Sequence, residues 1–130
     1  MRLLFVCVGN SCRSQMAEGI AKSLGHDAAS AGTNPASEVS KNALTVLQNM
    51  DIDTIGMKPK NLDLFNPEEF DLVISMGCGV ECPAIKLDDD WELEDPVGQP
   101  LSVFEQTAQQ IRRRILEIDN HSSSLSGRSP

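Results

Sequence analysis

Residues 3–24 read LLFVCVGNSCRSQMAEGIAKSL, and this stretch decides the fold class. Its first part, residues 3–8, is a short apolar run of the kind that forms a buried parallel strand. After a polar loop, Met16, Ile20 and Leu24 recur at helical spacing. This spacing predicts a helix from about residue 14 to residue 24, with Gly25 as its stop. A strand, a loop and a helix in this order begin an α/β protein.

The remaining elements continue the alternation of strands and helices. We expect a weak strand over residues 28–31, a helix over 39–50, a helical turn over 66–69, a strand over 72–76 and a last helix over 103–118. Residues 77–100 read as loop. These elements predict one domain, residues 1–118, with a doubly wound parallel sheet of about four strands and helices on both faces. Residues 119–130, rich in serine and without periodicity, are predicted to form a disordered tail.

Composition and charge exclude several function classes. The 130 residues carry 19 acidic and 11 basic side chains, a net charge of −8, which disfavours binding to nucleic acid. No apolar run approaches the ~18–20 residues of a membrane helix. The opening residues 1–10 lack the small-residue cleavage site of a signal peptide. We therefore expect a cytoplasmic protein without a membrane or nucleic-acid partner.

Four cysteines occupy positions 7, 12, 78 and 82. In a reducing cytoplasm such cysteines are more often reactive than structural. The two histidines, His26 and His121, lie far from them in sequence, so a zinc site has little support. We expect neither a bound metal nor a cofactor.

The loop of residues 7–14 has the composition of an oxyanion site. Its backbone N–H groups can turn inward around an anion, and the positive end of the helix dipole adds to their field. Arg13, six positions after Cys7, supplies a planar fork that matches two oxygens of a tetrahedral oxyanion. The positive surroundings favour the Cys7 thiolate, the form that attacks. The residues expected to bind the anion are Val8, Gly9, Asn10, Ser11, Cys12, Arg13 and Ser14.

A cysteine and an arginine at this spacing can also occur in an ordinary turn. The predicted strand before the loop, the predicted helix after it and Ser14 beside the arginine favour the oxyanion site. Within the loop we expect Asn10 and Ser14 to hold the backbone and to hydrogen-bond the sulfur. Cys12 is expected to pack against the helix.

Residues 7–19, CVGNSCRSQMAEG, resemble the active-site loop of the low-molecular-weight tyrosine phosphatase superfamily. The part from residue 10 onward is most similar to the arsenate reductases of that fold. The likeness extends to residue 118 and includes three later segments, residues 30–32, 71–76 and 95–96. The resemblance implies that Cys7 is the nucleophile, Arg13 the oxyanion clamp and Asp95 the general acid.

Some relatives hold a potassium ion beside this loop with Asn, Glu, Ser and Asp side chains. Asn10, Glu18 and Ser30 match the first three, but Lys60 stands at the position of the aspartate. An ammonium group there repels a cation. The resemblance therefore implies that this chain has no potassium site.

Asp95 ends an acidic run, since six of the eight residues from Asp88 to Asp95 are carboxylates. Most of this run is expected to be solvated surface. Pro96 restricts the backbone of Asp95 to extended conformations, and the neighbouring carboxylates disfavour its ionisation. Both effects suit an acid that protonates a leaving oxygen.

Cys78 and Cys82 separate a reductase from a phosphatase. A phosphatase needs one cysteine, because water resolves its phospho-enzyme, whereas a reductase needs further thiols to deliver two electrons. We predict a relay in the order Cys7, Cys78, Cys82. Residues four apart in a helix have Cβ atoms about 5–6 Å apart, but a disulfide wants about 3.8 Å, so the Cys78–Cys82 bond cannot form in an intact helix. The alternative is that both cysteines are semi-buried residues without a redox role.

Arsenate reductase is therefore the first hypothesis, with phosphate and sulfate as analogues of arsenate and with thioredoxin or glutathione and glutaredoxin as reductant. Residues 77–80 and 91–96 look more like the glutaredoxin-coupled reductases than the thioredoxin-linked ones, whose resolving cysteine directly follows the strand. The alternative is a tyrosine phosphatase of the same fold, which usually carries an aromatic residue near Val97. A third hypothesis is a redox-sensing or oxyanion-binding module without turnover.

Overall fold

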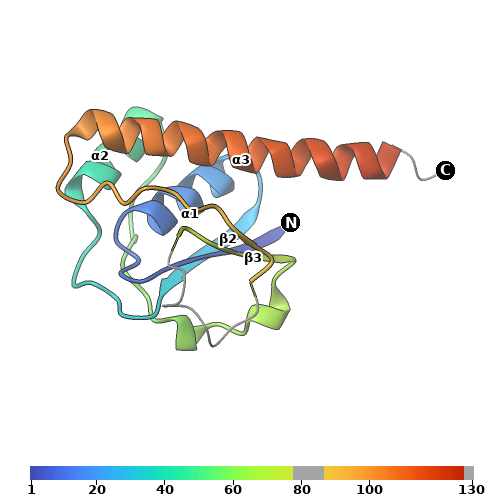
Figure 1. Cartoon of the computed structure of the whole chain (residues 1–130), viewed down its shortest axis with the longest axis horizontal. Helices are drawn as coiled ribbons and strands as arrows, with labels where there is room; N and C mark the ends of the chain where they lie inside the picture. Colours follow the sequence, from blue (N-terminus) through green and yellow to red (C-terminus); the bar gives the residue numbers. More distant parts are fainter. Residues whose placement is uncertain (78–86, 128–130) are drawn as a thin grey trace.

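The structure, a computed structural model, describes residues 1–77 and 87–127, with side chains described up to Asp119. Its strands are β1 (Arg2–Cys7), β2 (Asp27–Gly32), β3 (Leu72–Ser75) and β4 (Asp89–Asp90). Its α-helices are α1 (Arg13–Ser23), α2 (Lys41–Asn49) and α3 (Leu101–Gly127), and two short 3-10 helices are η1 (Leu62–Leu64) and η2 (Pro67–Glu69). Figure 1 shows the α-helices lying together above the sheet.

The described strands form one parallel sheet in the order β2-β1-β3-β4, so β1 lies inside the sheet and the chain winds outward from it in both directions. β1 pairs with β2 along its whole length, from Arg2 opposite Asp27 to Cys7 opposite Gly32. Because the strands are parallel, the carboxyl ends of β1 and β3 meet at the same edge. The predicted doubly wound parallel sheet is confirmed.

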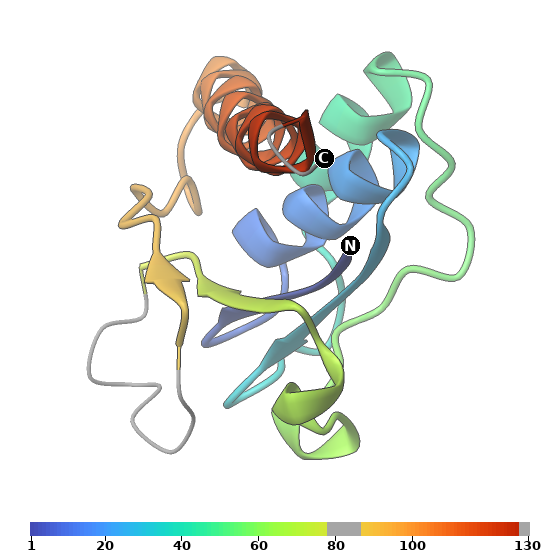
Figure 2. The same cartoon turned by 90° about the vertical axis from the view of Figure 1, so that its right-hand side faces the viewer.

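Alternate side chains of β1 point to opposite faces of the sheet. Leu3 and Phe5 belong to a large cluster with the α-helices, whereas Leu4 and Val6 belong to a smaller cluster with Leu62 of η1. Figure 2 shows α1, α2 and α3 on one side of the sheet and the 3-10 helices on the other. The prediction of helices on both faces is therefore confirmed, with the α-helices all on one face.

Asp89–Asp90 is a strand that the sequence analysis placed inside a loop. The pairing begins at Asp88, whose N–H donates to Val73 O at 2.8 Å and whose Oδ2 accepts from Val73 N at 2.7 Å. Trp91 N then donates to Ser75 O at 3.0 Å. A two-residue acidic strand has no alternating apolar pattern, so its sequence alone does not reveal it.

The prediction for the end of the chain is wrong in one respect. The last helix, α3, runs to Gly127 instead of ending at Ile118, so the part predicted as a disordered tail is helical up to residue 127. No glycine or proline occurs from Asp119 to residue 126, and each residue added to an existing helix needs no new nucleation. His26 Nε2 lies 2.7 Å from Asp119 Oδ1, at the point where the tail was expected to begin. Although α3 has 27 residues, neither it nor any other helix in the described part of the chain is apolar enough to cross a membrane.

Candidate active site

Cys7 is the last residue of β1, and its sulfur is held from within the loop that follows. Asn10 N donates to Cys7 Sγ at 3.1 Å, and Ser14 Oγ lies 2.8 Å from the same sulfur. Ser14 Oγ also accepts from Asn10 Nδ2 at 2.8 Å, so its own hydrogen is free to be donated to the sulfur. Asn10 and Ser14 thus make the two hydrogen bonds to the sulfur that the sequence analysis expected of them.

The backbone of the loop turns its N–H groups inward. Every carbonyl from residue 7 to residue 11 accepts a hydrogen bond from outside the loop: Cys7 O from Thr33 N, Val8 O from Asn34 N, Gly9 O from Ala36 N, Asn10 O from Gln15 Nε2 and Ser11 O from Ser40 N. In a trans peptide unit the N–H points opposite to the C=O. The N–H groups of residues 8–12 therefore face the concave side of the loop, where Asn10 N meets the sulfur. The predicted cradle of amides follows from this geometry.

Asn10 links the loop to the rest of the fold and has a left-handed backbone, with a φ of 50°. Its Oδ1 accepts from Lys60 N at 2.8 Å and from Gln15 Nε2 at 3.0 Å. Because Lys60 N can only donate, these contacts fix which way the Asn10 amide points. The sequence analysis missed Gln15, a buried residue whose place directly after Arg13-Ser14 was the one available signal.

Gly32, at the carboxyl end of β2, allows β2 to approach the loop closely. A Cβ at this position would lie 2.4 Å from Val8 O, a distance that no side chain tolerates, and 3.1 Å from Asn10 N. The loop can adopt its conformation beside β2 only because residue 32 has no side chain.

Arg13 is the first residue of α1, and its guanidinium spans the site. Nη1 donates to Met76 O at 2.6 Å and to Leu93 O at 2.8 Å, and Nη2 lies 3.9 Å from Asp95 Oδ2. The Arg13 side chain is 12% exposed, whereas that of Asp95 is 54% exposed. The structure thus brings three of the sequence-predicted residues, Cys7, Arg13 and Asp95, to one edge of the sheet.

Glu18 and Lys60 form a buried ion pair behind the loop. Glu18 Oε1 accepts from Ser30 Oγ at 2.8 Å and from Lys60 Nζ at 3.3 Å, and Glu18 Oε2 accepts from Lys22 Nζ at 3.0 Å. Burial raises the pKa of the Glu18 carboxyl, but Lys60, Ser30 and Lys22 outweigh burial and hold that pKa below its usual range. The Lys60 ammonium therefore lies beside the side chains that the resemblance associated with potassium. The absence of a potassium site stays a prediction.

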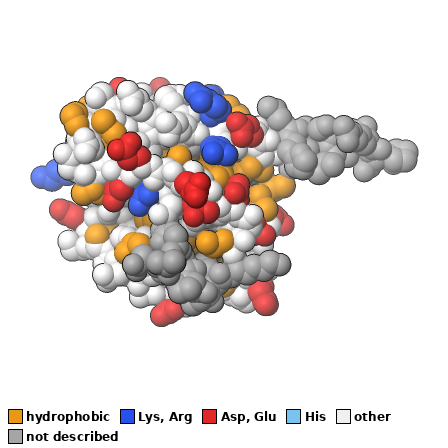
Figure 3. All heavy atoms as spheres, in the orientation of Figure 1, with side chains coloured by type: hydrophobic (Ala, Val, Ile, Leu, Met, Phe, Trp, Pro, Cys, Tyr) orange, Lys and Arg blue, Asp and Glu red, His pale blue; other side chains and the backbone are white. Residues whose placement is uncertain are grey.

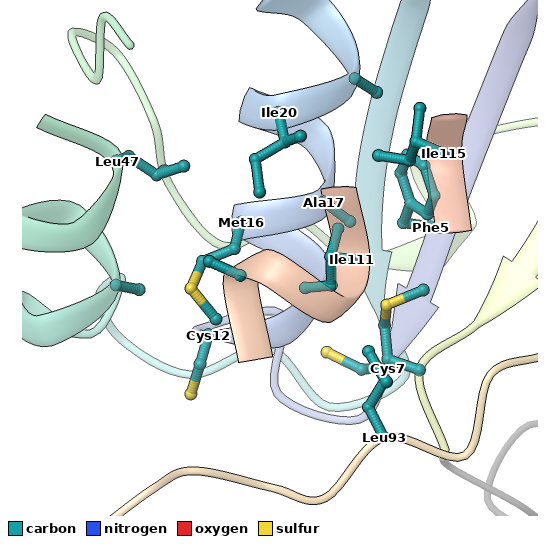
Figure 4. Close-up of a cluster of buried hydrophobic side chains, with 14 of the residues drawn as sticks. Phe5, Cys7, Cys12, Met16, Ala17, Ile20, Leu47, Leu93, Ile111 and Ile115 are labelled. Atoms are coloured by element: carbon teal, nitrogen blue, oxygen red, sulfur yellow. The ribbon is translucent and has the colours of Figure 1, made fainter. Parts of the chain in front are cut away.

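Cys12 lies in the loop, but its side chain packs into the large apolar cluster and not against the concave side. It is buried, and Figure 4 shows it with Met16 in the large apolar cluster. Burial raises the pKa of the Cys12 thiol, so this cysteine stays protonated and packs against α1, as expected. Cys78 and Cys82, the predicted relay cysteines, lie outside the described residues.

The surface field does not explain anion binding. On the face shown in Figure 3, basic side chains are scattered among acidic ones and form no continuous patch. With a net charge of −8, the chain as a whole repels an anion. The attraction must come from the loop amides, from Arg13 and from the first turn of α1, which no side chain caps in the described part of the chain.

Two cavities deserve comparison with this site. A groove of about 510 Å³ lies beside the loop, with Ser11 on one side and Val97 and Gly98 on the other. A larger cavity of about 690 Å³ between α2 and α3 contains no residue of the loop and is lined mostly by uncharged polar side chains. Its lining contains Ser102 but neither a cysteine nor a histidine that could activate the serine, so the greater volume does not indicate chemistry there.

Comparison with known proteins agrees with this geometry. The family of low molecular weight phosphotyrosine protein phosphatases matches residues 2–121. The glutaredoxin arsenate reductase of Synechocystis sp. is 40% identical over 121 residues, which cover 88% of this chain and 92% of that protein. A solved arsenate reductase in the phosphate binding state has a TM-score of 0.82 at 38% identity and covers 90% of this chain and 95% of its own. The low molecular weight protein tyrosine phosphatase from T. tengcongensis has a TM-score of 0.77 at 33% identity, covering 93% and 99%.

Fold and loop together define an α/β protein with a cysteine at the centre of an oxyanion cradle. The chain belongs to the low molecular weight phosphotyrosine protein phosphatase family. Within that family, it resembles arsenate reductases and a tyrosine phosphatase over most of its length. The curated relatives in this comparison are named arsenate reductases, which favours that activity over a phosphatase.

Proposed function

We propose that this chain reduces arsenate to arsenite, with Cys7 as nucleophile and Cys78 and Cys82 as a disulfide relay. The observation that carries the proposal is the Cys7 sulfur, which meets Ser14 Oγ at 2.8 Å and Asn10 N at 3.1 Å inside a ring of inward-facing amides. Such a site suits a tetrahedral oxyanion. The name of the Synechocystis relative supports arsenate as that anion. All residues of the proposal belong to the domain of residues 1–118.

In the first step the Cys7 thiolate attacks arsenic and an As–S bond forms. Asp95 gives a proton to an As–OH oxygen of hydrogen arsenate, and this oxygen leaves as water. Arg13 and the loop amides hold the remaining oxygens. Asp95 Oδ2 lies only 3.9 Å from Arg13 Nη2, so the acid is close to the bound anion, and its exposure lets it regain a proton from solvent.

In the second step the Cys78 thiolate attacks the Cys7 sulfur. An S–S bond forms, the As–S bond breaks and its electron pair stays on arsenic, which leaves as arsenite. Two thiols thereby lose the two electrons that arsenic gains. Cys82 then attacks Cys78, so that a Cys78–Cys82 disulfide forms and the Cys7 thiolate is restored.

We infer that glutathione with glutaredoxin reduces this disulfide. The sequence from Gly77 to Val80 and the name of the Synechocystis relative both favour this reductant over thioredoxin. Two glutathione thiols supply the two electrons and end as a disulfide. A cytoplasmic location fits this proposal, because the cytosolic glutathione pool is kept reduced.

Hydrolysis of phosphomonoesters is the second candidate, favoured by the likeness to a tyrosine phosphatase. The groove beside the loop is lined by Val97 and Gly98, directly after Asp95-Pro96, and Val97 is exposed. Neither Val97 nor Gly98 offers a phenol ring a stacking partner, and Phe104, an aromatic residue that also lines the groove, is only 2% exposed. We therefore expect only weak hydrolysis of aryl phosphates.

Arsenite production measured with glutathione and glutaredoxin, and separately with thioredoxin, tests the proposal. Cys7→Ser should abolish arsenite release with either reductant. Cys78→Ser should abolish multiple turnover, and full turnover by this variant contradicts the relay. Peptide mass spectrometry after one turnover should find Cys78 bonded to Cys82. A protein that binds phosphate but releases arsenite with neither reductant is instead an oxyanion-binding module.

A further inference from the structure

Gly77 follows Met76 at the carboxyl end of β3 and has a backbone φ of +110°. Residues with side chains rarely adopt this value. A Cβ at this position would lie 3.1 Å from Arg13 Nη1 and 3.1 Å from Leu93 O. Both distances are shorter than the contact of about 3.5–4.0 Å that non-bonded carbon atoms prefer. A side chain at residue 77 therefore meets the guanidinium of Arg13 as well as a strained backbone.

The atoms that such a Cβ would meet are not free to move away. Arg13 Nη1 already donates to Met76 O at 2.6 Å and to Leu93 O at 2.8 Å. Leu93 O is a backbone atom, and its neighbour Glu92 has a left-handed φ of 49°. If Nη1 moves away from residue 77, at least one of these hydrogen bonds lengthens. If φ of residue 77 turns negative, the chain leaves β3 in another direction.

We infer that Gly77 is a positioning residue for the oxyanion clamp, because it leaves open the space in which two carbonyls hold the Arg13 guanidinium. With Nη1 engaged by Met76 O and Leu93 O, the remaining N–H groups of the fork are available to an anion. This inference rests on the proposed role of Arg13. The same crowding and backbone conformation disfavour a thiol at residue 77, and in this chain the first cysteine after β3 is Cys78.

The test uses the full chain in a Cys78→Ser/Cys82→Ser background, where anion binding is measured without the relay. Cys7 is alkylated with neutral iodoacetamide, with and without inorganic phosphate, and its modification is followed by peptide mass spectrometry. For Gly77→Ala we expect the phosphate concentration that gives half-protection to rise roughly tenfold, because a charge-assisted hydrogen bond is weakened. Without phosphate, the alkylation rate should stay within about twofold, since the contacts of Cys7 with Asn10 and Ser14 are unchanged.

Gly25→Ala is the matched control, because Gly25 has a φ of +94° and no atom within 4 Å of a Cβ built there. Its half-protection by phosphate should stay close to that of the parent. If Gly77→Ala also matches the parent, the inference is wrong while the proposed function stands. If phosphate does not protect the parent itself, both fail, because Arg13 then clamps no anion.

If Gly77→Ala folds poorly, a double-mutant cycle of urea midpoints replaces the binding measurement. In an Arg13→Ala background a Cβ at residue 77 meets only the main-chain atoms Leu93 O and Glu92 Cα, so Gly77→Ala should shift the urea midpoint by the cost of the backbone alone. With Arg13 present, the shift should be larger, up to loss of folding. Equal shifts in the two backgrounds overturn the inference, because the cost then comes from the backbone alone.

Discussion

Lys60→Met tests whether the buried ion pair behind the loop supports the site. The substitution keeps most of the side-chain volume but removes the ammonium that lies 3.3 Å from Glu18 Oε1. Glu18 keeps Ser30 Oγ and Lys22 Nζ as partners. The Glu18 side chain is 7% exposed, that of Lys60 19% and that of Lys22 56%. Water therefore screens the attraction between Glu18 and Lys22 more than that between Glu18 and Lys60, so Lys60 provides most of the positive charge that balances Glu18.

The magnitude follows from these distances and exposures. At an effective dielectric constant of about 20, charges at this separation attract by about 5 kcal/mol, and desolvation of both ions offsets much of that attraction. Breaking a buried pair costs about 3–5 kcal/mol when the remaining charge has no partner. Because Ser30 and Lys22 remain, we expect Lys60→Met to lower the free energy of unfolding by about 2 kcal/mol at pH 7. For a chain of this size that is a fall in Tm of about 7 °C.

The loss should depend on pH, and its sign can be worked out. In the native chain the pKa of Glu18 lies below its usual range, so its stabilisation is present above the unfolded pKa and is lost as pH falls through the folded one. Without Lys60, only Ser30 and Lys22 remain to counter the rise in pKa that burial causes, so the pKa of Glu18 moves up. The difference between the two proteins should therefore be largest near pH 7, begin to narrow as pH falls through the raised pKa of Glu18 in the variant, and continue to narrow down to the lowered pKa of Glu18 in the native chain.

Urea unfolding at pH 7 and at pH 4 measures this difference, with Lys58→Met as the control because Lys58 is exposed. Lys58→Met should change stability by less than about 0.5 kcal/mol at both values. A loss that is the same at both pH values, or equal for the two lysines, refutes the electrostatic reasoning. Arsenate turnover should change little with Lys60→Met, because the backbone N–H of residue 60, which fixes the Asn10 side chain, is retained.

Three further predictions concern the loop and the acid. Ser14→Ala removes a donor 2.8 Å from Cys7 Sγ, so the alkylation rate of Cys7 at pH 7 should fall about tenfold; an unchanged rate would show that Asn10 N alone holds the thiolate. Gly32→Ala places a Cβ 2.4 Å from Val8 O, so it should lower the free energy of unfolding measured in urea by about 2 kcal/mol or more. Phosphate should then no longer protect Cys7 from alkylation. Gly56→Ala is the control and should keep that protection, because its Cβ meets nothing within 4 Å. Asp95→Asn should lower kcat by about 100-fold or more with little change in KM, and a mainly raised KM would assign Asp95 to binding instead of proton transfer.

Local patterns were sufficient for much of this fold. The run before Cys7, the spacing of Met16, Ile20 and Leu24 and the apolar residues 72–76 each lie within one element, and the structure has a strand or a helix at each place. The same holds for the loop, because the spacing of Cys7 and Arg13 and the change from strand to helix are both short-range features. Local sequence determines such features, since they depend on neighbours within a few residues.

The tertiary structure alone decided which distant groups complete the site. Met76 O, Leu93 O and Lys60 N reach Arg13 and Asn10 across 50 residues or more, and no periodic pattern encodes those contacts. β4 exists because β3 offers it a partner, and α3 passes residue 118 because helix elongation needs no further apolar signal. The sequence by itself indicated the cysteine that we propose as nucleophile, the arginine and the strand–loop–helix that presents them. Their orientation depends on backbone groups that only folding brings together, because every residue carries the same carbonyl and N–H and a sequence does not show where they point.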